Sequence, residues 1–387
     1  MARWKSWKFG STARKLPTLR GLETAQAREC WIGESVEPAT IARRFPSAFL
    51  PETLSRILSV PEGFLVKRRR NWDIHKMARL HAGEFYPIGE TREIRCENCW
   101  VHVPSGTVIS SDRQVLCDTS LAPDCLYEGH SEVPWEEAPW IDDDAFLLAT
   151  VWGGNFAHWL MDSLPRLVRA PEEKLLVGRS VSRFQQESLA LLGYQTDRLI
   201  IPETSLVRCR KLRVHVTSRT SGIPHPVCLE GIRSRLQSGA GASPAAPFRR
   251  LYISRQKTRR KILNHEDVLS VLQEFGFEEI FCEEMDFAEQ VRLFSSAEAI
   301  FGAHGAGTLN VLFAPRGSTL IEAYNPQVWD HAAHRVASLA GVHHFHLFAE
   351  NASKDFDVRI DPHLLARTLA LALKAEPPDP RLIEKIF

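Results

Sequence analysis

A histidine and a carboxylate stand four residues apart in the segment 153–166, whose sequence is GGNFAHWLMDSLPR. In a helix, His158 and Asp162 would share one face with Asn155, because residues at this spacing lie one above the other. A histidine beside a carboxylate at the rim of a cleft can take the proton from a hydroxyl as a general base. Taken alone, the pair also fits a hydrogen-bonded helix cap with a structural histidine.

A run of cations follows a predicted strand in the carboxyl half of the chain. Residues 249–261 contain seven of them: Arg249, Arg250, Arg255, Lys257, Arg259, Arg260 and Lys261. Parallel sheets bind ligands outside the carboxyl ends of their strands, so this run is placed to bind a diphosphate. A solvated positive face is the simpler interpretation, and nucleic acid is the competing anion. The net charge of only +1 and the lack of a recognisable nucleic-acid-binding motif argue against nucleic acid.

A glycine-rich loop follows the third predicted strand of the same half. Residues 302–307, GAHGAG, connect that strand to a short predicted helix at 306–313. Unpaired amides at a helix start favour an anion such as a phosphate, and glycines let the ligand approach the backbone. The spacing differs from the dinucleotide-binding pattern, and a turn that only closes a strand–helix unit is the alternative.

These motifs need elements to hold them, and the hydrophobic pattern predicts strands alternating with helices. In the carboxyl half we expect strands at 251–254, near 280, at 299–301 and at 319–323, and helices at 264–275, 286–296 and 306–313. In the amino half we expect strands at 145–152, 175–177, 199–201 and 212–216, and helices at 156–164 and 184–192. Alternation of this length is typical of parallel sheets.

The chain is long enough for two domains of ordinary size. It has 387 residues, of which 44% are hydrophobic and 25% charged, which excludes a disordered chain, a coiled coil and a disulfide-stapled miniprotein. The low-complexity stretch 238–247 is the predicted linker. We expect a partly irregular amino-terminal extension (1–140), two α/β domains (141–237 and 248–375) and a tail (376–387). Two such domains would bind a ligand in the cleft between them.

The sequence also predicts a location. The longest apolar run, 145–152, is too short to span a bilayer, and the first twenty residues lack the apolar stretch of a secretory signal. We therefore expect a cytoplasmic protein. Its basic amino terminus, with Trp4, Trp7 and Phe9, can make peripheral contact with an anionic membrane surface, although a solvated arm is the simpler interpretation.

Candidate metal ligands are few. Eight cysteines are spread along the chain without a disulfide framework. A structural zinc could be held by Cys96, Cys99, Cys117 and Cys125, but the second pair is spaced too widely for a typical zinc ribbon. Asp330, His331 and His334 have ligand spacing without a clear partner elsewhere in the sequence. The acidic clusters at 142–144 and 355–357 stand apart from the motifs above, so we expect no metal at the site.

The three motifs together resemble glycosyltransferase family 61. The family's Asn-Tyr-x-His-Trp-Leu-x-Asp-x-Leu-Pro-Arg is similar to residues 155–166, with Phe156 in place of tyrosine. Its downstream motifs Tyr-Ile-Ser-Arg, Arg-x-Ile-x-Asn-Glu and Gly-x-His-Gly-Ala-Gly-Leu-x-Asn are similar to residues 252–255, 260–266 and 302–310. The resemblance covers about residues 145–325. Two departures, Thr308-Leu309 and an additional His265, remove no charged group that we expect at the site.

The resemblance implies a GT-B-like α/β fold, with two Rossmann-like parallel-sheet domains around a cleft after an amino-terminal extension. It also implies an inverting, metal-independent glycosyltransferase. Such an enzyme moves a sugar from a nucleotide-diphosphate sugar, with UDP as the first choice of nucleotide, to a hydroxyl of a glycan, a polysaccharide or another acceptor. It needs no cofactor beyond this co-substrate. A catalytically silent protein that binds sugar nucleotides is the alternative, and a nucleic-acid-binding protein is a second one.

On this basis the carboxyl-terminal domain binds the donor and the domain before it binds the acceptor. We expect the diphosphate to contact Arg255, Lys257, Arg260, His304, Gly305, Ala306 and Gly307, with Asn310 nearby and Glu322 on the nucleoside hydroxyls. We expect Asp162 to act as the base and His158 to orient it, with Asn155 and Arg166 beside the acceptor. The reverse roles of His158 and Asp162 stay open.

Overall fold

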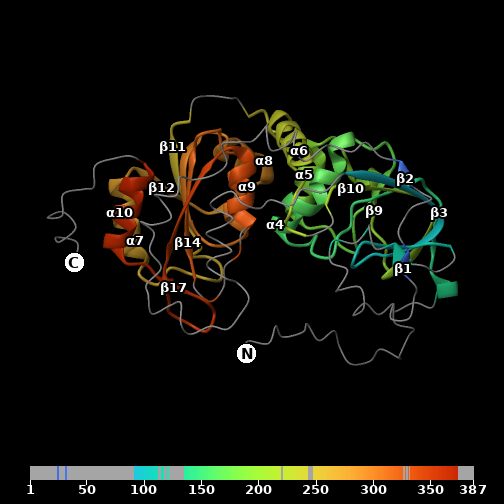
Figure 1. The fold of residues 1–387 in the computed structure, drawn as a ribbon, viewed down its shortest axis with the longest axis horizontal. Coiled ribbons are helices and arrows are strands. Elements are labelled where there is room, and N and C mark those ends of the chain that lie inside the picture. The colour runs from blue at the N-terminus through green and yellow to red at the C-terminus, as the bar shows by residue number, and fades with distance from the viewer. Residues whose placement is uncertain are drawn as a thin grey trace.

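The computed structural model describes residues 91–111, 115–116, 119, 121, 135–218, 221–242, 247–325, 327, 330 and 332–373, and two short strands at 24–25 and 31–32. In this part of the chain two β-sheets lie side by side with helices between them (Figure 1). Most of the expected extension, residues 243–246 of the linker and the tail from 374 onward lie outside the described residues. None of the helices described is long and apolar enough to cross a membrane.

The sheet of the amino half is mixed. Its strands follow the order β1-β5-β4-β3-β10-β7-β8-β9, with β2 beside β3 and β6 beside β10. β3 pairs antiparallel with β10, whereas β7 runs parallel to β10 on its other side. The strands are β1 Thr24–Ala25, β2 Trp31–Ile32, β3 Arg92–His102, β4 Thr107–Ile109, β5 Val115–Leu116, β6 Trp140–Ile141, β7 Ala145–Leu147, β8 Lys174–Leu176, β9 Leu199–Ile200 and β10 Leu206–Val216.

β3 lies in the segment that the sequence predicts to be an irregular extension. Its alternation of buried and exposed residues is interrupted at Asn98, whose φ of 51° is left-handed, and Glu97 and Asn98 are both exposed. Because of this interruption, the segment lacks the strict alternation of apolar and polar residues by which a strand is predicted from sequence. The predicted boundary at residue 140 therefore cuts through one sheet. We expect a parallel sheet from the sequence, but the observed sheet is mixed.

The sheet of the carboxyl half is parallel, with the order β12-β11-β13-β14-β15. Its strands are β11 Arg249–Ile253, β12 Phe277–Ile280, β13 Ala297–Ala303, β14 Thr319–Tyr324 and β15 His343–Phe348. The helices described in this half are α7 His265–Glu274, the 3-10 helix η8 Cys282–Glu284, α8 Phe287–Phe294, the 3-10 helix η9 Ala306–Phe313, α9 Ala332–Ala340 and α10 Pro362–Ala372. A small hairpin pairs β16 Glu350–Asn351 with β17 Val358–Arg359. In chain order the sheet runs 2-1-3-4-5, so the winding reverses between β11 and β13. Ligands of such sheets bind at this reversal.

The predicted helix at 156–164 is built from three different pieces. Asn155 caps α4 (Phe156–His158) by accepting a hydrogen bond from the amide of Ala157 at 2.9 Å. A π-helical turn, η5 (Trp159–Ser163), and a 3-10 helix, η6 (Leu164–Arg169), follow. Pro165 has no amide hydrogen to donate, so a regular α-helix cannot run through this point. π-helical turns of this kind are frequent at functional sites.

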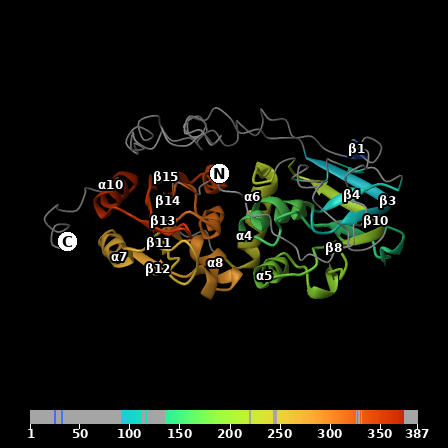
Figure 2. The same ribbon diagram turned by 90° about the horizontal axis from the view of Figure 1, so that it is seen from below.

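The two sheets share one apolar core. In the amino half α5 (Arg183–Leu191) and α6 (Pro226–Gly239) face the carboxyl half, where they meet α8 and η9 (Figure 2). Ile232 and Leu236 of α6 belong to the same buried cluster as Phe287 of α8. Arg233 of α6 donates a hydrogen bond to the carbonyl of Ala314 at 2.6 Å, just beyond η9. This packing fixes the position of one sheet relative to the other.

Ile232→Ala is expected to lower the free energy of unfolding by about 2–5 kcal/mol, because it leaves a cavity in the shared core. The matched change Ile201→Ala removes the same atoms from a residue that is 46% exposed, against 0% for Ile232. We expect it to cost less than about 1 kcal/mol. Denaturant unfolding followed by circular dichroism measures both losses. Equal losses would contradict the shared core.

Candidate active site

The cationic run and the glycine loop meet at the reversal of the carboxyl-half sheet. β11 and β13 are hydrogen-bonded neighbours, with Ile253 opposite Gly302. Beyond these strands the Arg255 guanidinium lies against the backbone of Gly305. A Cβ atom at Gly305 would stand 1.9 Å from Arg255 Nη1, so any side chain larger than hydrogen would displace the arginine. The structure thus brings together two motifs that lie 50 residues apart in the sequence.

Three arginines concentrate positive charge there. Burial lowers the pKa of Arg255, and Arg260 and Arg259 lower it further. Burial and Arg259 also lower the pKa of Arg260. The backbone holds the group together, because Arg255 Nε donates to the carbonyl of Arg259 at 3.0 Å. Among the described residues none of the three has a carboxylate within 4.0 Å, so their charge favours an incoming anion. We call Arg255, Arg259, Arg260 and the amides of 305–307 the anion cradle.

Other cations of the run are already paired. Lys257 forms an ion pair with Glu284, and its Nζ lies 4.0 Å from the centre of the Phe281 ring. The structure therefore turns Lys257 toward the end of β12 and away from its expected place with Arg255. Arg249 and Arg250 pair with Glu278 at 2.5 Å and Glu298 at 3.0 Å.

The backbone of the glycine loop has free amides. The amide of His304 donates to the carbonyl of Ala323 at 2.9 Å, so it is not available to a ligand. The first bond of η9 runs from Thr308 N to Gly305 O at 3.1 Å. The amides of Gly305, Ala306 and Gly307 precede that bond and have no acceptor within the helix. They complete the cradle.

Behind the cradle lies a buried cluster around Glu322, which is 0% exposed. Its Oε1 accepts from His304 Nδ1 at 2.9 Å and from Thr308 Oγ1 at 3.0 Å, and its Oε2 lies 3.2 Å from His344 Nε2. Burial alone would raise the pKa of Glu322, but His304 and His344 outweigh it and hold that pKa far below its usual range. Both oxygens are engaged inside the protein. Glu322 therefore cannot bind nucleoside hydroxyls as we expected.

His304 is held between two carboxylates. Its Nδ1 faces Glu322, and its Nε2 lies 3.5 Å from Asp330 Oδ2. Burial alone would lower the pKa of His304, but Glu322 and Asp330 raise it to about 9. A ring whose two nitrogens both face carboxylates is an imidazolium, and it adds a positive charge beside the loop.

Asn310 does not reach the surface. It is 0% exposed, and its Nδ2 donates to Gln290 Oε1 of α8 at 2.9 Å. Its Oδ1 has no hydrogen-bond partner among the described residues. In this orientation Asn310 does not face the place where we expect the diphosphate. Its side chain links η9 to α8 instead.

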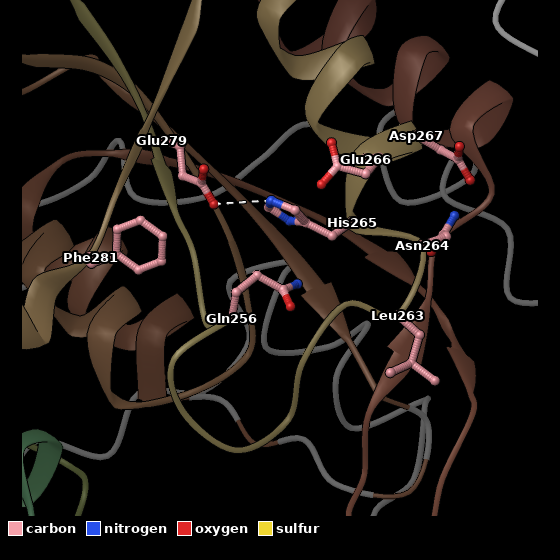
Figure 3. A pocket seen from close by; sticks show the side chains of 8 residues that line it. All are labelled: Gln256, Leu263, Asn264, His265, Glu266, Asp267, Glu279 and Phe281. Atoms are coloured by element: carbon pink, nitrogen blue, oxygen red, sulfur yellow. Dashed lines mark ion pairs between the residues drawn. The ribbon is translucent and has the colours of Figure 1, made fainter.

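A pocket that the sequence analysis missed opens beside the cradle. It measures about 440 Å³ and is lined by Gln256, Leu263, Asn264, His265, Glu266, Asp267, Glu279 and Phe281 (Figure 3). In Figure 3 the ring of His265 points toward Glu279, and their Nε2 and Oε1 atoms are 3.2 Å apart. The ring of Tyr252 stacks on the ring of His265, with their centres 5.9 Å apart. These residues surround one pocket only because of the arrangement of β11, α7 and β12. Their spacing in the sequence therefore does not predict a pocket.

In the amino half, His158 and Asp162 form a hydrogen-bonded pair. His158 Nδ1 lies 2.9 Å from Asp162 Oδ2, and Ser221 Oγ donates to the same oxygen. The amide of Gly222 donates to Asp162 Oδ1 at 2.8 Å. Asp162 is 2% exposed, whereas the His158 side chain is 30% exposed. With Nδ1–H given to the carboxylate, the lone pair of His158 is on Nε2.

Arg166 lies inside the domain and not beside an acceptor. It is 1% exposed, and its guanidinium donates to the carbonyls of Leu147 and Thr119, each at 3.4 Å. Burial lowers its pKa to about 10, and the charge of Asp162 opposes that shift. The sequence places Arg166 on the acceptor side, but the structure buries it, where its positive charge interacts with the carboxylate of Asp162. Asn155, by contrast, is exposed at the start of α4, where its side chain is occupied by the cap.

α9 connects this pair to the cradle. Arg335 of α9 donates from Nη1 to the carbonyl of Gly222 at 2.8 Å, and the amide of Gly222 holds Asp162. At the start of α9, Asp330 Oδ1 accepts from the amide of Ala332 at 2.7 Å while its Oδ2 faces His304. α9 therefore contacts the loop behind Asp162, and Asp330, two residues before α9, contacts the ring of His304 beside the glycine loop.

The described residues contain no cluster of three histidine, cysteine, aspartate or glutamate side chains that could hold a metal ion. Cys96 and Cys99 are buried thiols, and Cys117 and Cys125 lie outside the described residues, as does His331. The acidic cluster at 142–144 pairs with Arg210, Lys174 and Lys211 on the amino-half sheet.

The fold and these two groups define an α/β protein with an anion cradle at the reversal of a parallel sheet and a histidine–aspartate pair on a second sheet. Residues 156–321 match the family model Glycosyltransferase 61, which confirms the resemblance over this region. The region contains the histidine–aspartate pair, the arginines and the glycine loop.

Named relatives agree with the family match. Over 85 residues the chain is 36% identical to an alpha-1,3-arabinosyltransferase, XAT3, of Oryza sativa subsp. japonica, covering 21% of this chain and 15% of the relative. It is 28% identical over 85 residues to the EGF domain-specific O-linked N-acetylglucosamine transferase of Drosophila melanogaster, covering 21% and 16%. It is 36% identical over 76 residues to the protein O-linked-mannose beta-1,4-N-acetylglucosaminyltransferase 2 of Canis lupus familiaris, covering 19% and 13%. The aligned segments thus span less than a fifth of the length of each of these relatives.

The His304 cluster predicts a pH dependence of stability. The ring titrates near pH 6.5 when unfolded and near 9 when folded, so between these values the folded state keeps a proton that the unfolded state has lost. The bound proton of His304 should make its full contribution to the free energy of unfolding below about pH 6.5. This contribution, about 3 kcal/mol, should be lost as the pH rises to about 9. Denaturant titrations across this range measure it.

His304→Gln is the control for this prediction, because glutamine can still bond Glu322 but does not titrate. The variant should be less stable at pH 6.5 and should lose most of the slope. A slope that persists in His304→Gln would assign the effect to another group.

Proposed function

We propose that the protein is an inverting, metal-independent glycosyltransferase that moves a sugar from a nucleotide-diphosphate sugar to an acceptor hydroxyl. The observation that carries this proposal is the Arg255 guanidinium against Gly305, at the reversal of a parallel sheet and within the region that matches the family. A diphosphate is the ligand whose charge and size suit that cradle. In this proposal the two sheets form a GT-B-like pair, with the donor on the carboxyl half and the acceptor on the amino half.

The donor nucleoside extends from the cradle into the pocket of Figure 3. Gln256 belongs to that pocket and follows Arg255 directly in the chain. Glu279 and Glu266 offer carboxylate oxygens to ribose hydroxyls, a role that the buried Glu322 cannot take, and the amide of Gln256 can bond the edge of a base. The pocket favours a nucleoside and not a bare phosphate, because Glu266, Asp267 and Glu279 are among the residues that line it and their carboxylates repel an anion.

The acceptor is activated by His158. Its Nε2 takes the proton of the acceptor hydroxyl, while Asp162 holds the ring in the required tautomer and stabilises the imidazolium. This reverses the roles that we favoured from the sequence. The reason is that Asp162 is buried and already accepts bonds from His158, Ser221 and Gly222.

Bond formation and bond cleavage then occur at one carbon. The acceptor oxygen attacks the anomeric carbon from the face opposite the diphosphate, and the bond from that carbon to the diphosphate oxygen breaks. The configuration inverts in this single displacement. Negative charge develops on the leaving diphosphate, where the arginines, the imidazolium of His304 and the free amides stabilise it. These fixed positive groups do the work that a divalent ion would otherwise do.

Nucleotide binding tests the cradle. Arg255→Ala should weaken the binding of UDP by about 1.5–3 kcal/mol, the range for hydrogen bonds to charged groups, or roughly 10–150-fold. Gly305→Ala should weaken it similarly, because its Cβ would occupy the place of Arg255 Nη1. Titration calorimetry with UDP, GDP and ADP measures these affinities.

Arg249→Ala is the matched control, since Arg249 comes from the same cationic run but is paired with Glu278. It should leave every nucleotide affinity unchanged. Wild-type affinity in both Arg255→Ala and Gly305→Ala would remove the cradle from the donor site.

Turnover tests the base. His158→Gln should lower kcat for sugar transfer by roughly 10²–10⁴ with little change in nucleotide affinity. Asp162→Asn should also slow turnover, because it removes the carboxylate that orients the ring. The assay uses a panel of nucleotide sugars in the presence of EDTA, and activity should persist without added Mg²⁺ or Mn²⁺.

His343→Gln changes an exposed histidine at the start of β15 and serves as the control. If His158→Gln kept wild-type turnover, the base would be another group. If EDTA abolished transfer and Mn²⁺ restored it, the metal-free cradle would be wrong. Binding of nucleotides without any transfer or hydrolysis would indicate a silent binding protein.

A further inference from the structure

Trp152 is an exposed aromatic side chain next to the histidine–aspartate pair. It lies in the turn between β7 and α4, and α4 packs against η9 of the carboxyl half and is labelled next to that half in Figure 1. The residue is 42% exposed, and the described part of the chain has few large apolar residues as exposed as this one. Its ring centre is 5.1 Å from that of His158, with the planes tilted by 41°.

The backbone of this turn is fixed even though the ring is open to solvent. The carbonyl of Trp152 accepts from the amide of Asn155 at 2.8 Å, and the amide of Gly153 donates to Thr150 O at 3.0 Å. Gln185 of α5 donates to the carbonyl of Gly153 at 3.0 Å. The backbone that carries the indole is therefore fixed, and the His158 ring lies beside the indole, as a preorganised binding surface requires.

Space for a ligand exists beside this surface. A Cβ atom at Gly154 would have no heavy atom within 4 Å, whereas one at Gly153 would stand 3.0 Å from Thr150 Oγ1. The chain thus packs against the protein on the Gly153 side and is open on the Gly154 side. A ligand that covered the indole would gain the free energy of removing that apolar area from water.

The position of His158 limits what that ligand can be. An acceptor hydroxyl that gives its proton to Nε2 must come within about 2.6–3.2 Å of that nitrogen. Since the two ring centres are only 5.1 Å apart, a group that binds at Nε2 is close enough to contact the indole as well. A sugar ring has hydroxyls at its rim and a face of C–H groups, which packs against an aromatic ring. A serine or threonine side chain has no such face.

We propose that Trp152 is the platform on which the acceptor packs, and that the acceptor hydroxyl belongs to a sugar ring and not to a serine or threonine side chain. This proposal rests on the proposed function and narrows its acceptor to a saccharide. The names of the relatives include both a transferase specific for EGF domains and one for O-linked mannose, so the family match alone does not make this choice.

The test compares two acceptor classes and two tryptophans. The donor is the nucleotide sugar that the wild type hydrolyses or transfers fastest. The acceptors are methyl glycosides of glucose, galactose, mannose, xylose, arabinose and N-acetylglucosamine, and peptides that contain serine and threonine. We expect transfer to at least one glycoside and none to the peptides. Trp152→Ala should raise KM for that glycoside at least tenfold, whereas its dissociation constant for the nucleotide should change less than twofold.

Two variants separate stacking from damage to the fold. Trp152→Tyr keeps an aromatic face and should restore most of the glycoside affinity. Trp140→Ala removes a tryptophan of similar exposure, 37%, that lies on β6 against Arg208, and it should leave transfer unchanged. Loss of glycoside affinity in Trp152→Ala with no rescue by tyrosine would overturn the stacking role.

The remaining outcomes distinguish a failure of this acceptor proposal from a failure of the proposed function. Transfer to the peptides, or an unchanged KM for the glycoside in Trp152→Ala, would overturn this proposal while leaving the transferase intact. Neither transfer nor hydrolysis of any donor would overturn the proposed function, and the acceptor platform with it.

Discussion

Each sheet leaves an apolar face toward the other, and α5, α6, α8 and η9 fill the space between these faces as one packed core. Close-packed interiors transmit strain and resist small displacements. η9 belongs to this layer and begins at the glycine loop, while Leu160 and Leu164, on either side of Asp162, point into the same core. Group transfer requires such fixed positions, because a small misplacement of the reacting groups costs much of the rate.

Buried charge organises the donor side from within the sheet. Glu322 lies at the centre of β14 without solvent, so its charge has to be neutralised by neighbours, and His304 and His344 do so. Breaking such a pair by removing one partner is costly, since it leaves an uncompensated charge in the interior. The same interaction keeps a positive ring beside the glycine loop. The stability of the sheet and the electrostatics of the cradle therefore depend on one carboxylate.

The sequence predicts local features well and the partners of long side chains poorly. The helix that starts at Asp286 was predictable because its capping box with Glu289 is local, and the meeting of Arg255 with the glycine loop follows from strand order alone. The positions of Lys257 and Arg166 were not predictable. They depend on Glu284, which follows another strand, and on the carbonyl of Leu147 across the fold. β3 stayed hidden because Asn98 interrupts its pattern.

The pairing of β3 with β10 determines how short a working fragment can be. A fragment that starts at residue 141 would contain the histidine–aspartate pair, the arginines and the glycine loop, but it would lack β3. Ten residues of β10, between Leu206 and Val216, would then present an open row of backbone donors and acceptors. An open edge of this length is a template for another copy of the same strand, so the fragment would aggregate during production. The smallest fragment suited to expression therefore begins before Arg92, well upstream of the region that matches the family model.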